Sequence, residues 1–505
     1  AAQSRRVLLA LSAVMLVILF TVLAALNVAG LRDRLLPGGA SPGIHSIAVL
    51  PVENLSGDPQ QEYFADGMTE ELITRLSKIG ALRVTSRTSA MRYKGTKEPV
   101  PQIAQELNVD AIMEDSLLRE GSRVRFAARL IDARTEKDLW AESYTRDLHS
   151  VLTLQSDVAL AVAREIRIAV TPQEKTLLAR TQAVNPAAYE AYLKGRSLAE
   201  DLSAAKLDAA LEYFNLALEK QPDYAPAYIG IAQVWSRRGQ MGLVSLAEAK
   251  GKAMPATVKA LELDPTLAEG HFMLAAIKTW VDWNWSGAES EFKKAIGLNP
   301  SLSEGHAVYS HFLMLMGRPE EASQQIQRAM QLDPLNAFVQ SFYAVELLCS
   351  HRYDDAIAQD ETVLKVAPGT RLAHDNLWSA FNEKQEYAKA LNEIKFMFGE
   401  RILEGMKGAE AGQLSKAEYV AALRLAAGNL AAHSNQSHVP RFWIAKLYAE
   451  AHDNNRAVEW LEKSYQARES QLPYLKVLPA WDDMRSDPRV RDILRRMNFP
   501  GEAGA

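Results

Sequence analysis

Five prolines between residues 222 and 368 each follow an alanine by twelve residues. The intervals between successive prolines are 43, 35, 34 and 34 residues, and a period near 34 is typical of a solenoid built from helix-turn-helix units. Proline ends a helix because it lacks an N–H and restricts the residue before it, whereas a small alanine lets a neighbouring helix approach closely. The register therefore predicts a stack of paired helices. The pairs are Ala210 and Pro222, Ala253 and Pro265, Ala288 and Pro300, Ala322 and Pro334, and Ala356 and Pro368.

Other positions recur in the same register. A large residue beside a small one follows the prolines by nine and ten residues, as in Leu274-Ala275 and Tyr343-Ala344. Asp264, Asn299 and Asp333 stand immediately before three of the prolines and are turn formers. These positions resemble the tetratricopeptide repeat (TPR). The resemblance implies an all-α solenoid whose first helices line a groove that binds proteins or peptides.

The repeats are expected to extend beyond the five prolines. The stretch from Pro440 to Ala467 has the apolar spacing of a first and a second helix. We expect about seven units over residues 186–467. A capping segment over residues 468–505 follows, in which Asp487 is an N-cap and Pro488 takes the first helical position.

The start of the chain is apolar. Residues 7–29 form a run of 23 residues without a charged side chain, long enough to cross about 30 Å of hydrocarbon. We expect a transmembrane anchor over residues 1–36 and a flexible Pro- and Gly-containing linker over residues 37–43. A cleaved signal peptide is the alternative, although its apolar region usually spans only about 7 to 15 residues. Two arginines flank the run on each side, so charge does not orient it.

Residues 44–170 alternate strand and helix patterns. Residues 46–51 have the pattern of a buried strand, and residues 62–79 that of an amphipathic helix. Apolar and charged side chains alternate along residues 123–132, which predicts a strand paired in a hairpin with residues 109–118. The pattern predicts a compact α/β domain.

Several motifs of this domain are specific. They are Ile47-Ala-Val-Leu-Pro, Asn54-Leu-Ser-Gly-Asp-Pro, Tyr63-Phe-Ala-Asp-Gly-Met-Thr-Glu-Glu-Leu, Leu130-Ile-Asp-Ala and Leu139-Trp-Ala-Glu-Ser-Tyr. Together they resemble the TolB/FlgO-type amino-terminal domain of bacterial envelope proteins. That family usually has glycine where this chain has Asp115, which argues against a role that needs close backbone approach at that strand.

The whole arrangement resembles the C-terminal half of bacterial membrane signalling proteins. In those proteins the cytoplasmic N-terminal part is a serine/threonine kinase, a CadC-type winged-helix regulator or a nucleotide cyclase. The resemblance implies a single-pass protein of the bacterial inner membrane, with its N-terminus in the cytoplasm and both domains in the periplasm. Because the chain begins with Ala1 rather than methionine, we also expect an N-terminal portion to precede it.

Composition and motifs exclude several classes of function. The net charge of −5 and an isoelectric point near 6.1 give no electrostatic footprint for nucleic acid. Cys349 is the single cysteine, which excludes an internal disulfide and a cysteine-based zinc site. His433 and His438 are five residues apart, a spacing that does not place two metal ligands on one helical face. Phosphate-loop, zinc-protease, esterase and kinase motifs are absent from the sequence, so we expect no catalytic, cofactor or metal site.

The TPR resemblance places nine candidate residues on the groove side of the first helices. Their mixture of apolar and polar groups suits an extended or helical peptide. Trp280, with Trp283 and Trp285, is either an aromatic anchor for a partner or packing at a helix turn. The candidates are Gln233, Arg237, Phe272, Trp280, His311, Met314, Asp375, Ser379 and Asn382.

These patterns predict a non-enzymatic, membrane-anchored interaction or sensor module that binds envelope proteins or peptides. The alternative is the sensory half of a truncated kinase, cyclase or winged-helix regulator, and a third hypothesis is a structural envelope or motility accessory. The oligomeric state stays open. A homodimer would suit a single-span receptor, yet residues 7–29 carry no distinctive small-xxx-small pattern.

Overall fold

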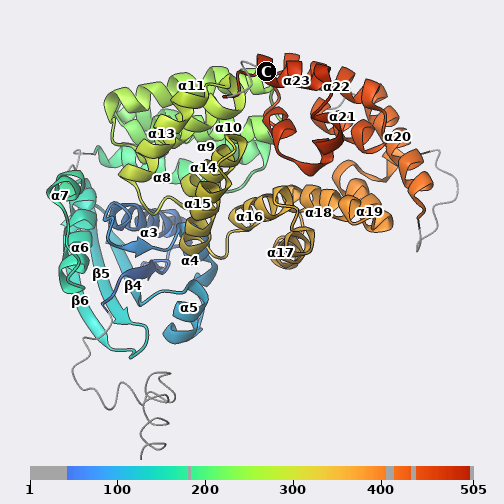
Figure 1. The fold of residues 1–505 in the computed structure, drawn as a ribbon. Helices are drawn as coiled ribbons and strands as arrows, with labels where there is room; N and C mark the ends of the chain where they lie inside the picture. Colours follow the sequence, from blue (N-terminus) through green and yellow to red (C-terminus); the bar gives the residue numbers. More distant parts are fainter. Residues whose placement is uncertain (1–42, 180–183, 405–413, 434–439, 501–505) are drawn as a thin grey trace, which may run out of the picture. The chain divides into compact units, whose positions relative to one another are not determined.

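The computed structural model contains an α/β domain followed by a helical array, within one compact unit of residues 45–505 (Figure 1). The structure describes residues 43–179, 184–404, 414–433 and 440–500.

A six-stranded mixed sheet forms the centre of the α/β domain. The strand order is β3-β1-β4-β5-β6, with β2 paired to β4 beside this path. Strand β1 lies parallel to β3 and β4, whereas β4, β5 and β6 form an antiparallel meander. The predicted hairpin is confirmed, and it turns at Gly121, whose φ of 61° favours glycine. The strands are β1 Ser46–Val49, β2 Glu53–Asn54, β3 Arg83–Val84, β4 Ala111–Glu120, β5 Arg123–Asp132 and β6 Asp138–Asp147.

Two long helices cover one face of this sheet. The side chains of Val124, Phe126 and Ala128 on β5 are buried, whereas Arg123 and Arg125 between them are exposed, as the alternation predicts. Helices α3 and α6 pack against each other and against the sheet. The helices of the domain are α3 Glu62–Leu76, α4 Arg87–Ala90, α5 Val100–Leu107, α6 Val151–Glu165 and α7 Pro172–Ala179.

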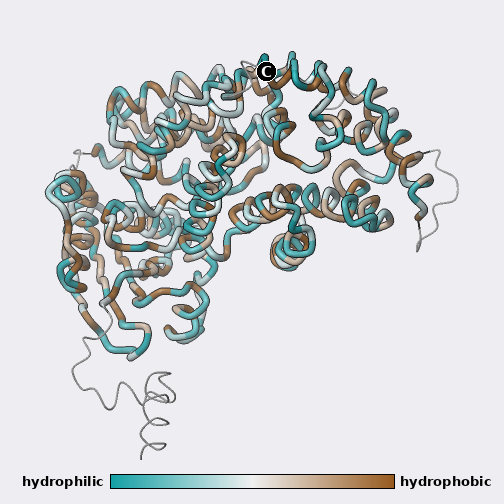
Figure 2. Tube along the Cα trace, in the orientation of Figure 1, coloured by the Kyte–Doolittle hydropathy of each residue, from teal (hydrophilic) through white to brown (hydrophobic). Residues whose placement is uncertain are grey.

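The array is a TPR-type solenoid of paired helices. In the described residues seven helix pairs follow one another, with α20 Lys416–His433 between the sixth and the seventh. Hydrophobic and hydrophilic residues alternate along these helices (Figure 2), as amphipathic packing requires. The pairs are α8 Pro186–Ala199 and α9 Ala204–Lys220, α10 Ala225–Gln240 and α11 Leu246–Leu263, α12 Ala268–Ile277 and α13 Trp285–Leu298, α14 Ser303–Leu315 and α15 Pro319–Leu332, α16 Ala337–Cys349 and α17 Tyr353–Val366, α18 Arg371–Glu383 and α19 Tyr387–Phe398, and α21 Arg441–Glu450 and α22 Asn454–Gln466.

The last part of the array is not a helix pair. After α22 the chain forms the short 3-10 helices η7 Leu472–Lys476 and η8 Pro479–Met484, and then α23 Pro488–Arg496. The Asp487 side chain accepts from the Arg489 N–H at 2.8 Å, so the predicted N-cap of α23 is confirmed.

The register alanines are buried in every repeat where they were predicted. Their side chains are between 0% and 2% exposed. The larger side chains of Phe214, Phe292 and Ile326, four residues later, are fully buried beside them. The space next to one alanine is tight, because a Cβ atom on Gly230 would come within 2.5 Å of the Phe214 ring. Close approach at small residues therefore sets the spacing of the helices.

The predicted membrane span requires a correction. Crossing a membrane takes about 20 consecutive apolar residues, and no helix in residues 43–179, 184–404, 414–433 or 440–500 is long and apolar enough. Residues 7–29, and all but the last residue of the predicted linker over 37–43, lie outside the described residues. The predicted fold class is wrong in including a single-pass helix, and the inner-membrane localisation built on that helix falls with it.

The α/β domain packs directly on the first helix of the array. The rings of Phe64 and Tyr189 meet edge to face at 6.2 Å. A Cβ atom on Gly67 of α3 would come within 2.5 Å of Leu193 Cδ2 on α8, so the absence of a side chain at residue 67 allows the two helices to approach. An ion pair between Arg196 and Glu70 joins the same two helices.

A buried carboxylate makes the second attachment of the α/β domain. Asp333, between α15 and α16, accepts from the Ser89 N–H at 3.0 Å and from its hydroxyl at 2.6 Å. Asn336 and Ser303 donate to the other oxygen at 2.7 Å and 3.3 Å. Beside them the Ser86 N–H donates to the Leu332 carbonyl at 2.8 Å. Asp333 is fully buried and satisfied, so it links the β3–α4 segment to the fourth helix pair.

We expect the substitution Asp333→Ala to lower the free energy of unfolding by about 3 kcal/mol, because it leaves several buried donors without an acceptor. The chain offers a matched control, since Asp264 also precedes a proline but accepts only from Thr266 in its own turn. Asp264→Ala is expected to cost about 1 kcal/mol. Urea unfolding of both variants measures the difference, and equal costs would contradict the linking role of Asp333.

Candidate functional site

The nine predicted groove residues lie on four first helices and the segment after one of them. Gln233 and Arg237 lie on α10, Phe272 on α12, Trp280 on the π-helical turn Lys278–Asp282, His311 and Met314 on α14, and Asp375, Ser379 and Asn382 on α18. Contacts with other parts of the chain divide these residues into four groups.

The α14 group is covered by the chain's own C-terminal part. His311 and Met314 are 1% and 7% exposed. The Tyr474 hydroxyl of η7 lies 2.8 Å from His311 Nδ1, and the Phe342 carbonyl lies 3.1 Å from Nε2. Burial lowers the pKa of His311 to about 4, so the ring is neutral near pH 7. A neutral ring fits both contacts, because Nε2–H donates to the carbonyl and Nδ1 accepts from the tyrosine.

The tryptophan-rich turn also packs on the C-terminal part. Trp280 is half-buried and meets the Phe292 ring edge to face at 6.5 Å. Trp285 donates from Nε1 to the Met497 carbonyl at 2.9 Å and stacks on Phe499 at 4.3 Å. Phe272, the other candidate here, is half-buried against the same core. Trp285 is thus used for packing within the chain, whereas Trp280 and Phe272 keep part of their surface exposed.

The α18 group surrounds a buried lysine from α21. Lys446 Nζ donates to Asp375 and to the Ser379 hydroxyl, at 2.7 Å in each case. The same ammonium lies 3.9 Å from the ring centre of Trp378. Lys446 is 0% exposed, and a charge at that depth requires partners of this kind. Asn382 is half-buried at the end of the same helix.

A second carboxyl lies beside this lysine. Trp378 Nε1 donates to Glu450 Oε2 at 2.9 Å. Burial raises the pKa of Glu450 to about 8, although the nearby Lys446 charge acts in the opposite direction. Glu450 therefore carries its proton near pH 7, and the lysine shares its charge mainly with Asp375.

The α10 group contacts the neighbouring first helix α8. Gln233 Oε1 accepts from Arg196 at 2.9 Å, and Arg237 donates to the Ala199 carbonyl. The charges of Glu269 and Glu304, at the starts of α12 and α14, act on Arg196. No hydrogen bond or ion pair among the described residues engages either carboxylate. Glu304 is exposed, and desolvation by the neighbouring helices raises the pKa of its carboxyl.

The structure thus brings Asp375 and Ser379 together around one cation but does not join all nine residues in one open surface. Tyr474 and Lys446, which cover the α14 and α18 groups, were missed by the sequence reasoning. Lys446 had one available signal, since it stands six residues after Pro440 in the repeat register. Nothing in the sequence pairs Tyr474 with His311, because 163 residues separate them.

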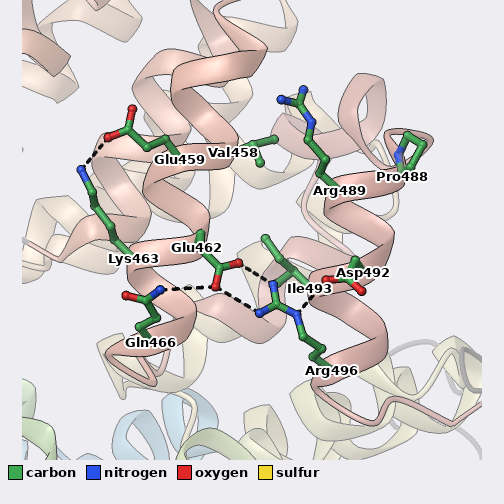
Figure 3. A pocket seen from close by; sticks show the side chains of 10 residues that line it. All are labelled: Val458, Glu459, Glu462, Lys463, Gln466, Pro488, Arg489, Asp492, Ile493 and Arg496. Carbon is green, nitrogen blue, oxygen red and sulfur yellow. Dashed lines mark hydrogen bonds and ion pairs between the residues drawn. The ribbon is translucent and has the colours of Figure 1, made fainter.

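A surface hollow of about 650 Å³ lies between α22 and α23 (Figure 3). Ile493 and Val458 give it apolar parts, and charged side chains surround them. Those charges are already paired, since Arg496 contacts Glu462 and Lys463 contacts Glu459. The charged side chains in these described pairs are therefore not free to bind a charged ligand.

A second hollow of about 520 Å³ lies over the outer face of the sheet, where Ser116, Ala127 and Ser143 are small. Strand alternation turns Asp115 to the opposite face, where it is 6% exposed and finds no hydrogen-bond partner in the described residues. Burial raises the pKa of Asp115 well above its usual range.

No group of His, Cys, Asp and Glu side chains in the described part of the chain has the arrangement of a metal site.

Other residues singled out in the sequence have structural surroundings. Burial raises the pKa of the half-buried Cys349 thiol to about 12, so this cysteine is not a reactive thiolate at neutral pH. Of the two histidines considered for metal binding, His438 lies outside the described residues, as does the side chain of His433.

Comparison with known proteins gives partial matches. No family model matches the chain. The chain is 33% identical over 245 residues to putative adenylate cyclase 3 of Rhizobium meliloti, a match that covers 48% of this chain and 41% of the cyclase-named protein. It is 21% identical over 305 residues to the transcriptional regulator HilA of Salmonella typhimurium, covering 60% of this chain and 53% of HilA. The chain thus spans about half or less of each relative.

Solved structures of helical repeat proteins are also similar. A thermophilic TPR protein of Thermus thermophilus, TTC0263, matches with 20% identity and a TM-score of 0.31, over 41% of this chain and all of that protein. The assignment of the array to the TPR type rests on its own helix pairs and register.

We expect Glu450 to make stability depend on pH. Its folded pKa of about 8 lies above the ordinary value of 4.5, so its contribution to stability is present at low pH and is lost as pH rises between these values. The free energy of unfolding of the wild type should therefore fall between about pH 5 and pH 8. Glu450→Gln retains an oxygen for the Trp378 N–H and should make this decline shallower.

Urea unfolding at a series of pH values measures this slope. Glu459→Gln on α22 is the control, because that side chain is 60% exposed and should leave the slope unchanged. An identical slope in wild type and Glu450→Gln would show that Glu450 is not a protonated buried acid.

Proposed function

We propose that this chain is a non-catalytic protein-interaction and sensor module of a longer signalling protein. The helical array supplies an extended polar surface, and the α/β domain is fixed to it at α8 and at Asp333. Binding at either part would therefore affect the other, because the two attachments hold them as one body.

The observation that carries this proposal is the pair of relatives. One is named as a cyclase and the other as a transcriptional regulator, so their outputs differ. Their matches cover 48% and 60% of this chain, which together exceed the whole, so the two matched stretches overlap. A region shared by proteins with different outputs is best explained as a common input or interaction part.

For the α/β domain we favour the TolB/FlgO type. The motifs Ile47-Ala-Val-Leu-Pro and Leu139-Trp-Ala-Glu-Ser-Tyr carry this assignment. In the structure the first motif contains β1, which lies between β3 and β4 in the sheet, and the second motif lies in β6 at the edge of the sheet. Under this assignment the domain is a binding domain rather than an enzyme.

The binding surface that we favour lies on α10 and at the starts of α12 and α14. The α14 and α18 groups are already covered by Tyr474 and Lys446. The carboxylates of Glu269 and Glu304 have no ion-pair partner among the described residues. Both lie near the predicted groove residue Arg237. A lysine or arginine of a protein or peptide partner would form charge-assisted hydrogen bonds with these carboxylates.

Panning random dodecapeptides on phage against the full chain tests this proposal, with the Kd of each selected peptide measured by fluorescence anisotropy. Glu269→Gln with Glu304→Gln is expected to weaken selected basic peptides by about tenfold or more, since a charge-assisted hydrogen bond is lost. Glu320→Gln on the second helix α15 is the matched control and should change little. Failure to select any peptide would contradict the interaction proposal, and equal binding by the variant would contradict this surface.

A second candidate is the sensory part of a nucleotide cyclase. The cyclase-named relative favours it, because that match has the higher identity of the two. A protein expressed with the coding sequence upstream of this chain would then form cyclic nucleotide, whereas this chain alone would not. Absence of that activity in the longer protein would leave the regulator-type output as the better alternative.

A further inference from the structure

The fourth residue of five successive first helices makes the same contact. Its side chain hydrogen-bonds the carbonyl of the proline six residues earlier, which ties the start of the helix to the preceding turn. The pairs are Tyr228 with Pro222 at 3.2 Å, His271 with Pro265 at 3.0 Å, His306 with Pro300 at 3.0 Å, Gln340 with Pro334, and His374 with Pro368 at 3.0 Å. We call these five side chains the proline latches.

Four latches also reach the second helix of their own pair. Their partners stand nineteen or twenty residues later and differ in charge. The contacts are His271 with Glu291 at 2.6 Å, His306 with Gln325 at 2.6 Å, Gln340 with Gln359 at 3.3 Å, and His374 with Glu393 at 2.5 Å. Each of these latches therefore joins a turn, a first helix and a second helix through one side chain.

The partners decide how many protons each ring needs. A carbonyl and a carboxylate can only accept, so His271 and His374 make both contacts only when both ring nitrogens carry a proton. An amide can present either its oxygen or its NH₂ group, so His306 makes both contacts as a neutral ring. Burial lowers the pKa of His306, in agreement with a neutral ring.

His271 and His374 are the two latches with a carboxylate partner. The charged groups around them lie on the neighbouring elements. Around His271, Lys278 lies 3.0 Å and Lys294 3.7 Å from the other oxygen of Glu291. Burial tends to raise the pKa of Glu291, but the His271 and Lys278 hydrogen bonds prevail and lower it. Glu291 is therefore ionised at neutral pH, with Lys278 beside one carboxylate oxygen and the His271 ring beside the other.

The His374 ring hydrogen-bonds the Glu393 carboxylate of α19. The Phe396 ring stacks on the imidazole at 3.5 Å. In the described residues no other charged side chain hydrogen-bonds or forms an ion pair with the ring of His271 or His374.

We propose that His271 and His374 are proton-dependent latches, which hold the α12–α13 and α18–α19 pairs closed as imidazolium ions and loosen them when the proton is lost. Loss of one proton leaves a bare ring nitrogen facing an acceptor, so one of the two contacts must break. Both contacts of each ring are therefore made together only while both ring nitrogens carry a proton.

The array would then be stiffer in acid and looser in mild alkali at two defined helix pairs. The α14–α15 and α16–α17 pairs between them carry neutral partners and would not respond. This inference does not depend on the proposed function, because it concerns the helix pairs themselves.

Nitrogen-15 spectra of the histidine rings in the full chain test the protonation directly. At pH 7 we expect His271 and His374 to show two protonated nitrogens, and His306 and His311 to show one. In Glu291→Gln and Glu393→Gln the corresponding ring should become singly protonated at the same pH. Singly protonated His271 and His374 in the wild type would overturn the proposal.

Amide hydrogen exchange measures the mechanical consequence. Between pH 6 and pH 8, after correction for the intrinsic chemical rate, exchange in the first turns of α12 and α18 should rise at least fivefold, and in those of α14 and α16 it should not. The Glu291→Gln, Glu393→Gln double variant should lose this pH dependence in the first turn of α12, whereas α18 should retain the part that comes from Glu450.

The chain also offers a gain-of-function control. Gln325→Glu converts the neutral latch of His306 to the acidic type, and the first turn of α14 should then acquire the same pH dependence. An unchanged pH response in both the double variant and Gln325→Glu would overturn the proposal. Because Gln325→Glu adds a contact rather than removing one, the test does not depend on a destabilised variant.

Discussion

Close approach at one small residue in each second helix is the constraint on which the array depends. Ala210, Ala288 and Ala322 have fully buried side chains, and the next helix can reach the backbone there only because nothing larger intervenes. Larger side chains such as Phe214 then fill the space beside the alanine. The prolines set where each pair ends, and the proline latches tie each new first helix to the turn that the proline creates. The close helix spacing, the proline that ends each pair and the proline latch of the next first helix therefore recur together along the array.

The C-terminal part shares one hydrophobic core with the later repeats. Tyr474 against His311 and Lys446 against Asp375 place polar groups of the last segments on first helices far earlier in the chain. These contacts are buried, so each polar group needs its partner, and the surface predicted for a ligand is partly used by the chain itself. A TPR array of this kind has less free groove than its number of helix pairs implies. The Glu304 side chain near this surface is exposed and has no partner among the described residues, and for this reason the surface is the favoured place for a partner.

Local patterns in the sequence predict much of the fold, whereas they do not predict the contacts between distant segments. The register alanines, the hairpin of β4 with β5 and the Asp487 cap follow from spacing and residue type, and the structure confirms them. Asp333 was recognised only as a turn former, because its link to Ser89 spans 244 residues and leaves no periodic trace. The nine groove candidates came from the repeat register alone, which carries no information on what covers them. The membrane span was inferred from apolar length in residues 7–29, and the helices of the described residues do not supply one.

The segment η7, residues Leu472–Lys476, is packed into the core of the array and covers α14. Hydrogen exchange of the η7 amides, followed by mass spectrometry in the unliganded full chain, tests this packing most directly. If Tyr474 is held by His311 as described, these amides should be protected to the same degree as those of α14 and should open only with it. Exchange of η7 at the rate of an exposed loop, while α14 stays protected, would contradict the account.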